Sequence, residues 1–379
     1  MAAVVALVSM GTMAAIAAGQ GAMPQLLSGA PLAGDAQFGK IAAYVARFGR
    51  TRPVIAIIGE NSGTELTDYV IPYGVLAQSG VAETIAVATQ PGPIAMRPAL
   101  HIQPQATIAE FDARFPDGAD YVIVPAVGKR NDPALLAWIA AQGAKGGTIV
   151  SICDGALVVA GTGLMKGHRA TAHWATQGLR AKEYPDTQWV KNVRYVADGR
   201  IVSSAGISAA IPTSIALVEA IAGHDRAASL AEELGVVDWS TAHDSDVFLP
   251  RFGVNLMAFV RTTYTNARLH RMQDIGVPVA PGVDEIALAL TADAWSRTGR
   301  SHAYALSASA APLQTLHGLT VLPDRVVGGV NPVDHALPAF DATPVGRVLD
   351  EALAGIAARF GRSTAYGVAL DFEYPGFGK

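Results

Sequence analysis

The chain has almost no cysteine: Cys153 is the only one among 379 residues. A single cysteine excludes an internal disulfide framework and any metal site built from several cysteines. Charge is also scarce, since 16% of the residues are charged and the formal net charge is −4, without a long basic run. This argues against an electrostatic nucleic-acid surface. No Gly-x-Gly-x-x-Gly motif follows a predicted strand, so nothing supports a dinucleotide site, and we expect neither a cofactor nor a metal.

The N-terminus lacks charge altogether. From Met1 to Gly34 there is no charged side chain, and small and large apolar residues dominate up to Ala18. Such a segment is typical of a signal-peptide core or a marginal membrane span, but the usual basic residues before it are missing, and the first basic residue is Lys40. We therefore expect residues 1–36 to export the chain or attach it to a membrane. A cytoplasmic protein with an apolar N-terminal helix, or with a wrongly assigned start, is the alternative.

Apolar residues are plentiful, at 50% of the chain, and their pattern predicts alternating strands and helices over residues 51–225. Short apolar runs predict buried strands, each followed by a helical stretch, and Asp198-Gly199 marks a hairpin turn. The four predicted strands lie at 53–59, 84–89, 119–128 and 148–152. Apolar strands that alternate with helices indicate a doubly wound, mostly parallel α/β sheet.

The remainder, 226–379, is less regular but contains a weak internal repeat. Asp284 opens a helical stretch much as Asp68 does, and the spans from these residues to Pro323 and Pro104 are 39 and 36 residues. We interpret 276–325 as a partial copy of the first half of the α/β region, without its cysteine, followed by two helices. Chance similarity between two apolar strand–helix–strand units is the alternative.

Cys153 lies where the strand at 148–152 turns into a helix. Such an elbow presents its side chain, and the following helix N-terminus favours a negative charge, so we expect a lowered thiol pKa and a nucleophilic thiolate. His173 follows twenty residues later and is a plausible proton-transfer partner. A buried structural cysteine is the alternative, because free cysteines are among the most buried residues.

Two stretches carry a family resemblance: SICDGALVVAGTGLMKGHRATAHW and VADGRIVSSAGISAAIPTSIALVEAI. They resemble the ThiJ/PfpI superfamily of class I glutamine-amidotransferase-like proteins, nearest the branch that holds the sensor domains of AraC-type regulators and isonitrile hydratase. The resemblance covers about residues 53–222. It implies a flavodoxin-like fold with a nucleophile elbow.

The resemblance implies roles for single residues. Cys153 takes the place of the family nucleophile, Asp68 in DYVIP takes that of its acidic partner, and His173 matches the family histidine. A helix N-cap is the alternative role for Asp68, and Glu65 is the second candidate for the acid. His168 more plausibly faces solvent.

Backbone N–H groups form the oxyanion hole in proteins of this kind. We expect them at Asp154, after the cysteine, and at Ala126 and Val127 in the turn after the third predicted strand. Two departures weaken this expectation: the turn lacks the family's two glycines, and Asp154 stands where threonine or alanine is usual. The Asp154 carboxylate either raises the thiol pKa or serves as an acid–base group itself.

These residues predict a cysteine-dependent hydrolase or hydratase that acts on a small electrophilic molecule. A ligand or redox sensor without turnover is the alternative; 226–379 shows no basic pair of helix-turn-helix units, so we expect no nucleic-acid partner. A third possibility is an inactive structural module. Related domains often dimerise, so a homodimer is possible. We expect His243-Asp244-Ser245-Asp246 to be a solvated loop and the closing Asp371-Phe372-Glu373-Tyr374 to be a packed terminus.

Overall fold

The structure is a computed structural model that describes residues 39–340 and 343–378. The predicted export or membrane segment, 1–36, lies outside the described residues. Within them, no helix is both long enough and apolar enough to cross a membrane.

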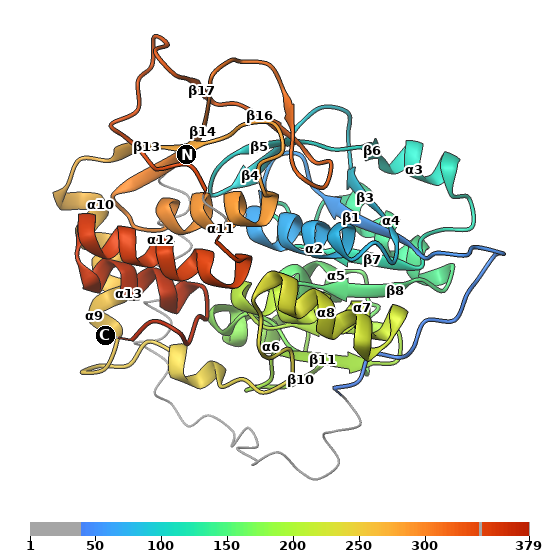
Figure 1. The fold of residues 1–379 in the computed structure, drawn as a ribbon. Helices are drawn as coiled ribbons and strands as arrows, with labels where there is room; N and C mark the ends of the chain where they lie inside the picture. The colour runs from blue at the N-terminus through green and yellow to red at the C-terminus, as the bar shows by residue number, and fades with distance from the viewer. Residues whose placement is uncertain (1–38, 341–342, 379) are drawn as a thin grey trace.

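A seven-stranded sheet forms the centre of the first two thirds of the chain (Figure 1). Its strand order is β11-β12-β8-β7-β1-β3-β6, and every neighbouring pair is parallel except the β11–β12 hairpin. The predicted doubly wound, mostly parallel α/β sheet is therefore confirmed, and the hairpin turn falls at Asp198-Gly199 as expected. The strands are β1 (Val54–Gly59), β3 (Glu83–Ala88), β6 (Ala106–Thr107), β7 (Tyr121–Val124), β8 (Thr148–Ser151), β11 (Tyr195–Asp198) and β12 (Ile201–Ser204).

Helices cover both faces of this sheet because successive side chains of its strands point to opposite sides. In β1, Ile55 and Ile57 belong to one apolar core, whereas Ala56 and Ile58 belong to the other. The first core also takes side chains from α2 (Leu66–Ser79), α7 (Ala210–Ala222) and α8 (His224–Leu234). The second takes them from α3 (Ile108–Arg114), α4 (Pro133–Ala144) and α5 (Gly155–Gly161).

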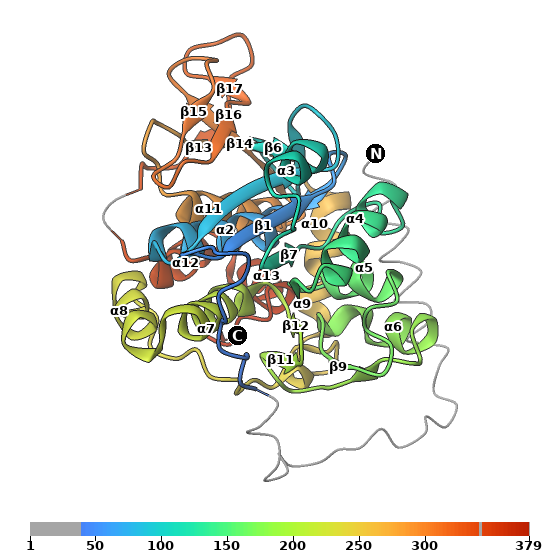
Figure 2. The ribbon, with the colours of Figure 1, turned by 90° about the vertical axis from the view of Figure 1, so that its right-hand side faces the viewer.

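A smaller sheet follows in the C-terminal part, with all its strands parallel and the order β17-β14-β13-β18. Its strands are β13 (Gln273–Pro278), β14 (Ser301–Ser307), β17 (Arg325–Val326) and β18 (His335–Ala336). Helix α11 (Glu285–Ser296) connects β13 to β14 and lies beside α2, as Figures 1 and 2 both show. The chain closes with α12 (Val345–Phe360) and α13 (Arg362–Asp371).

A third sheet joins the two parts of the chain, in the order β15-β16-β5-β4-β2. It combines two hairpins that are far apart in the sequence, and β5 and β16 pair at their junction. Its strands are β2 (Thr64–Glu65), β4 (Ile94–Arg97), β5 (His101–Gln103), β15 (Leu313–Gln314) and β16 (Thr320–Leu322).

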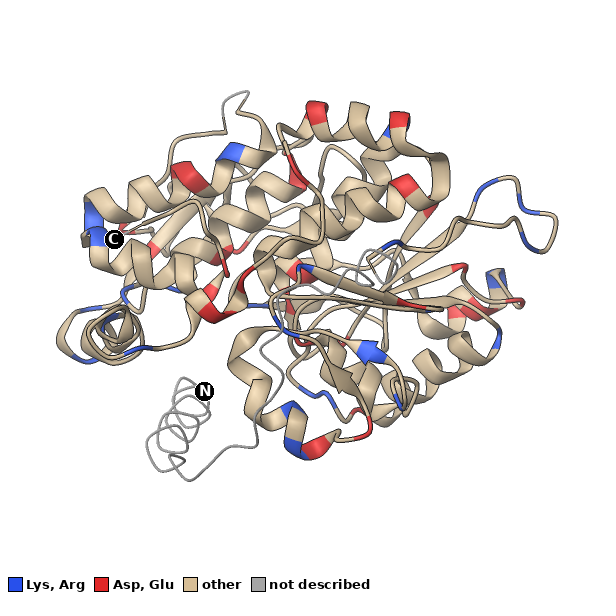
Figure 3. Ribbon diagram, turned by 90° about the horizontal axis from the view of Figure 1, so that it is seen from below, with Lys and Arg blue, Asp and Glu red and all other residues tan. Residues whose placement is uncertain are grey.

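Short elements complete the described chain. They are the strand pair β9 (Arg169–Ala170) and β10 (Gln188–Trp189), helices α6 (Gln177–Glu183), α9 (Leu256–Val260) and α10 (Asn266–Leu269), and a π-helical turn at Arg261–Thr265. Acidic and basic residues are interspersed along the ribbon when it is seen from below (Figure 3).

Candidate functional site

Cys153 lies at a sharp turn between β8 and α5. Its φ of +53° is in the left-handed region, which non-glycine residues rarely adopt and which often marks functional turns. Gly155 permits the turn, because a Cβ at this position would lie 2.0 Å from the carbonyl oxygen of Val124. The thiol is 6% exposed. The predicted elbow is therefore present, and it holds the cysteine just beneath the surface.

Asp68 lies in the first turn of α2, and Glu65, not Asp68, occupies the N-cap. The Asp68 side chain is fully buried, one of its oxygens accepts the Ala126 N–H at 3.1 Å, and its Oδ1 has no partner among the described residues. Burial raises the Asp68 pKa well above its usual range, although the Ala126 N–H opposes this shift. Asp68 therefore keeps its proton to a higher pH than an exposed carboxyl does, and one of its oxygens has no partner among the described residues.

The loop after β7 corrects one expectation for the oxyanion hole. The Ala126 N–H donates to Asp68 rather than pointing into open space, and the Ala126 carbonyl accepts the Glu65 N–H at 2.8 Å. Val127 forms an isolated bridge with Thr64. The bridge is made by the Glu65 and Gly128 N–H groups and does not use the Val127 N–H. This loop therefore fixes the acid, and of the expected oxyanion donors the Val127 and Asp154 N–H groups remain predictions.

The Asp154 side chain points towards a polar cluster around α6. It accepts the Thr176 hydroxyl at 2.6 Å, and burial raises its pKa, although the nearby His173 opposes the shift. The Arg180 side chain is buried in the same cluster; its Nη1 donates to the His173 carbonyl at 2.5 Å, and its Nε has no partner in the described part of the chain. The sequence analysis missed Arg180, because an arginine near the end of a helix is usually solvent-exposed.

Both ring nitrogens of His173 are engaged by backbone groups. Its Nε2 lies 2.9 Å from the Asp371 carbonyl, to which it donates, and its Nδ1 accepts the Ala175 N–H at 3.2 Å. The prediction that His173 exchanges protons with Cys153 is therefore not supported by this geometry. His173 instead fixes the C-terminal segment against the site.

That segment adds a buried carboxylate that the sequence analysis left as a packed terminus. Glu373 is fully buried and accepts the Trp174 N–H and the His243 Nε2–H, both at 2.8 Å. Burial alone would raise the Glu373 pKa, but the two histidines and the N–H outweigh it, so the pKa is lowered. His243 thus has a nearly buried side chain, which corrects the expectation of a solvated loop at His243-Asp244-Ser245-Asp246.

Arg297, from α11, connects the C-terminal part of the chain to the same region. Its guanidinium donates to Glu65 and Asp293, and to Asp371 at 2.6 Å. Glu65, the second candidate for the acid, is therefore an ion-pair partner of Arg297. No local motif signals this contact, because Glu65 and Arg297 are 232 residues apart in the sequence.

Carboxyl groups surround the thiol, and this overturns the expectation of a lowered pKa. Burial raises the Cys153 pKa well above its usual value, and the charges of Asp68 and Asp154 raise it further. The following helix, α5, has only seven residues, and burial and these charges outweigh its effect. Cys153 is therefore a neutral thiol near neutral pH.

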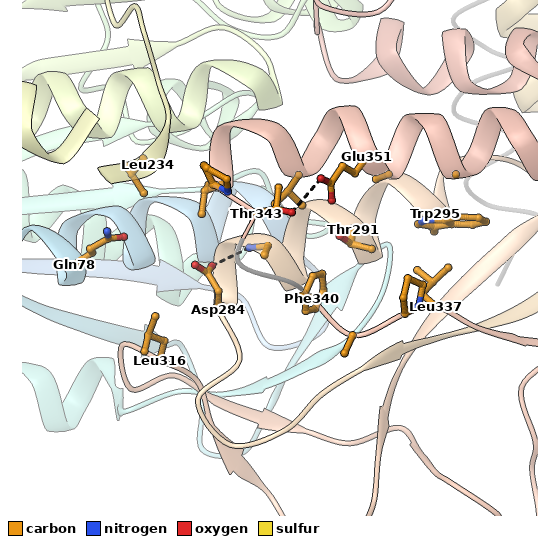
Figure 4. Close-up of a pocket in the computed structure, with 18 of the residues that line it drawn as sticks. Gln78, Leu234, Asp284, Thr291, Trp295, Leu316, Leu337, Phe340, Thr343 and Glu351 are labelled. Atoms are coloured by element: carbon orange, nitrogen blue, oxygen red, sulfur yellow. Dashed lines mark hydrogen bonds between the residues drawn. The ribbon is translucent and has the colours of Figure 1, made fainter. Parts of the chain in front are cut away.

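The described residues offer no metal site, since no three His, Cys, Asp or Glu side chains are placed to hold an ion. A cavity of about 570 Å³ lies elsewhere, between α11, α12 and the 337–340 segment (Figure 4). Its labelled residues include Asp284, Trp295 and Glu351, and Cys153 is not part of its lining.

Residues 54–220 match the DJ-1/PfpI family. An isonitrile hydratase of Pseudomonas putida is 31% identical over 166 residues, which span 42% of this chain and 68% of that protein. This chain belongs to the DJ-1/PfpI family. The predicted ThiJ/PfpI resemblance is thereby confirmed.

Two further similar proteins match either over less of their own length or with lower identity. The HTH-type transcriptional regulator CdhR of Pseudomonas aeruginosa is 30% identical over 125 residues, which span 32% of this chain and 37% of that protein. The solved structure of Drosophila melanogaster DJ-1beta is 20% identical, covers 50% of this chain with all of its own, and has a TM-score of 0.45. The family match ends at residue 220, so His243, Arg297 and Glu373 lie outside it.

Proposed function

We propose that this DJ-1/PfpI protein uses Cys153 and Asp68 to add water to a small uncharged electrophile, and that the electrophile is an isonitrile. The observation that supports this most is Asp68, a fully buried carboxyl with an unpartnered Oδ1, close enough to the elbow thiol for its charge to raise the thiol pKa. The isonitrile hydratase relative suggests the substrate class.

The protonation states suit an isonitrile because its terminal carbon takes up both a proton and a nucleophile. In this proposal Asp68 enters the reaction protonated, which its raised pKa favours, and the raised pKa of Cys153 keeps the thiol neutral near neutral pH. Asp68 acts as a general acid and gives its proton to the isonitrile carbon while the Cys153 sulfur bonds to that carbon. The thiol proton passes to the Asp68 carboxylate, which restores the acid and leaves a thioimidate on Cys153.

Water completes the reaction. It adds to the thioimidate carbon, the C–S bond then breaks, and the sulfur regains a proton as the N-substituted formamide leaves. Arg180 lies near enough for the Cys153 charge to influence its pKa, and its unpartnered Nε is a donor for charge that develops during this step.

The surroundings of the thiol define the substrate class further. Cys153 is almost buried, and Asp68, Asp154 and Glu373 contribute negative charge when they ionise. Such a site disfavours anions, because a buried charge is stable only when it is paired. A small neutral molecule therefore fits better than a carboxylate or phosphate substrate.

The test is the formation of formamide from cyclohexyl isocyanide, followed by proton NMR. We expect turnover by the full chain, loss of turnover in Cys153→Ser, and a reduction of about 10²-fold or more in Asp68→Asn, the contribution typical of a general acid. His168→Ala is the matched control, because this side chain is 40% exposed and should not affect the rate.

Unchanged turnover in folded Asp68→Asn would contradict the proposed role of the acid. The absence of both formamide and a covalent Cys153 adduct by mass spectrometry would contradict the catalytic proposal. That second result would favour the alternative, a binding or sensing module of the same fold.

A further inference from the structure

The two parts of the chain repeat the same elements at a constant offset. β1 begins at Val54 and β13 at Gln273, a difference of 219 residues, and α2 and α11 begin at Leu66 and Glu285 with the same difference. The starts of β4, β5 and β6 are likewise separated by 219 residues from those of β15, β16 and β17. The strand orders β6-β3-β1-β7 and β17-β14-β13-β18 correspond as well.

Individual hydrogen bonds follow the same offset. The Gln105 N–H donates to the Ala86 carbonyl at 2.8 Å, and the Asp324 N–H donates to the Ala305 carbonyl at 2.9 Å. In return, each alanine N–H donates to the side-chain oxygen of its partner, at 2.8 Å in both cases. The offset also corrects the register expected from the sequence, because Asp284 corresponds to Glu65 and not to Asp68.

The two parts meet in the manner of a two-fold symmetric interface. In the junction of β5 and β16, Ile102 pairs with Val321, which is its own counterpart at the offset of 219. The flanking pairs are Gln103 with Thr320 and His101 with Leu322. An interface is isologous when residue i of one copy contacts residue j of the other, and residue j of the first copy contacts residue i of the second. This reciprocity is the hallmark of a two-fold dimer.

Helices α2 and α11 meet in the same reciprocal way. The Thr67 hydroxyl donates to Asp293 at 2.9 Å, and a Cβ on Gly74 would lie 2.5 Å from Ile286. Ile286 is the counterpart of Thr67, and Asp293 is the counterpart of Gly74. Both helices are buried on nearly all sides, because they cover each other and because α7 also packs on α2 and α12 on α11.

We propose that residues 273–326 are a built-in partner: they occupy, within one chain, the face of residues 54–107 on which a second copy of this chain would otherwise dock. The built-in partner also reaches the cysteine site, since Arg297 pairs with Glu65 beside Asp68. The possible homodimer expected from the sequence is thereby replaced, on this face, by an intramolecular contact.

The position that corresponds to the Cys153 site on the other side of the two-fold contact lacks the residues of that site. The counterpart of Arg297 is Gln78, and that of Asp68 is Ala287. Gln78 and Ala287 both line the cavity of Figure 4, where no cysteine elbow is present. The cavity is thus the counterpart of the Cys153 site, without its thiol and its acid.

Disulfide trapping tests the built-in partner without relying on activity. In a Cys153→Ala background, Gln103→Cys and Thr320→Cys place two half-buried cysteines directly opposite each other in an antiparallel pair. The Cα separation of such pairs, about 4.5–5.5 Å, suits a disulfide. We expect oxidation to give one disulfide within a single chain, identified by non-reducing electrophoresis and by the mass of the linked peptides.

Ile102→Cys alone, in the same background, is the control. A homodimer through β5 would bring two copies of this residue together across its axis, whereas the built-in partner places Val321 there. We therefore expect no cross-link between chains. A covalent dimer of either variant, or a double variant that forms no disulfide, would overturn the proposal; neither result bears on turnover, so the proposed function is tested separately.

Discussion

Residues 54–107 and 273–326 place their strands and their helix in the same way, yet only the first region leads to a thiol. After β7 the chain continues through α4 and β8 to the elbow, whereas after β18 it passes directly to α12. Asp68 has Ala287 as its counterpart. The comparison teaches that this arrangement of strands and helix forms without Cys153 and Asp68. The proposed chemistry depends on the elbow and on a few side chains at the contact between the two regions.

The largest expected effect comes from the contact between Thr67 of the first region and Asp293 of the second. Asp293 is fully buried and receives both the Thr67 hydroxyl and the Arg297 guanidinium. Asp293→Ala should lower the free energy of unfolding by about 2–3 kcal/mol, because the buried Thr67 hydroxyl loses its acceptor and Arg297 keeps only two of its three carboxylate partners. Urea unfolding measures this value, and a loss below about 1 kcal/mol would contradict the account of this contact.

A smaller effect is expected at the counterpart position, Gly74. Gly74→Leu should cost about 1–3 kcal/mol, since its side chain must displace Ile286 and push α2 and α11 apart. Gly178→Leu in α6 is the matched control: the position is exposed, and a Cβ there meets nothing within 4 Å. Equal stabilities of the two variants would show that the α2–α11 contact is looser than described.

The smallest effect on stability is a change in its pH dependence. Asp68 has a raised pKa in the folded chain, so the folded state binds more protons than the unfolded state above the unfolded pKa of about 3.9. Stability therefore falls as the pH rises from about 4 through the folded pKa, with a limiting slope of about 1.4 kcal/mol per pH unit. Asp68→Asn should remove this contribution, so urea unfolding of the variant should depend less on pH. An unchanged slope would contradict the raised pKa.

Local pattern predicted the sheet and the elbow because both depend on residues close in the sequence. The apolar run 148–152, followed at once by small residues, specified the turn at Cys153. A helix N-cap was the alternative role for Asp68, and the structure excludes it, because Glu65 occupies that position. Because the sequence analysis matched Asp284 to Asp68 and not to Glu65, the expected alignment of the two helices was three residues out of register.

Apart from Arg180, whose contacts are local, the parts of the site that were missed depend on distant contacts. His173 has a family-like sequence context, but its Nε2 donates to the carbonyl of Asp371, 198 residues away. Arg297 and Glu373 reach the site from beyond the family match. The thiol pKa was misjudged for the same reason, because the expectation counted the short α5 and not the burial and the carboxyl groups that the fold brings around Cys153.

The most direct test of the central claim, a neutral thiol whose pKa is raised by burial and by Asp68, is the titration of Cys153 in the full chain. Thiolate absorbance at 240 nm reports this group alone once the Cys153→Ser spectrum is subtracted, because the chain has no other cysteine. We predict a titration midpoint above the value of about 8.5 for a free thiol, and a lower midpoint in Asp68→Asn. A wild-type midpoint near or below neutral pH would show a resident thiolate and contradict the account.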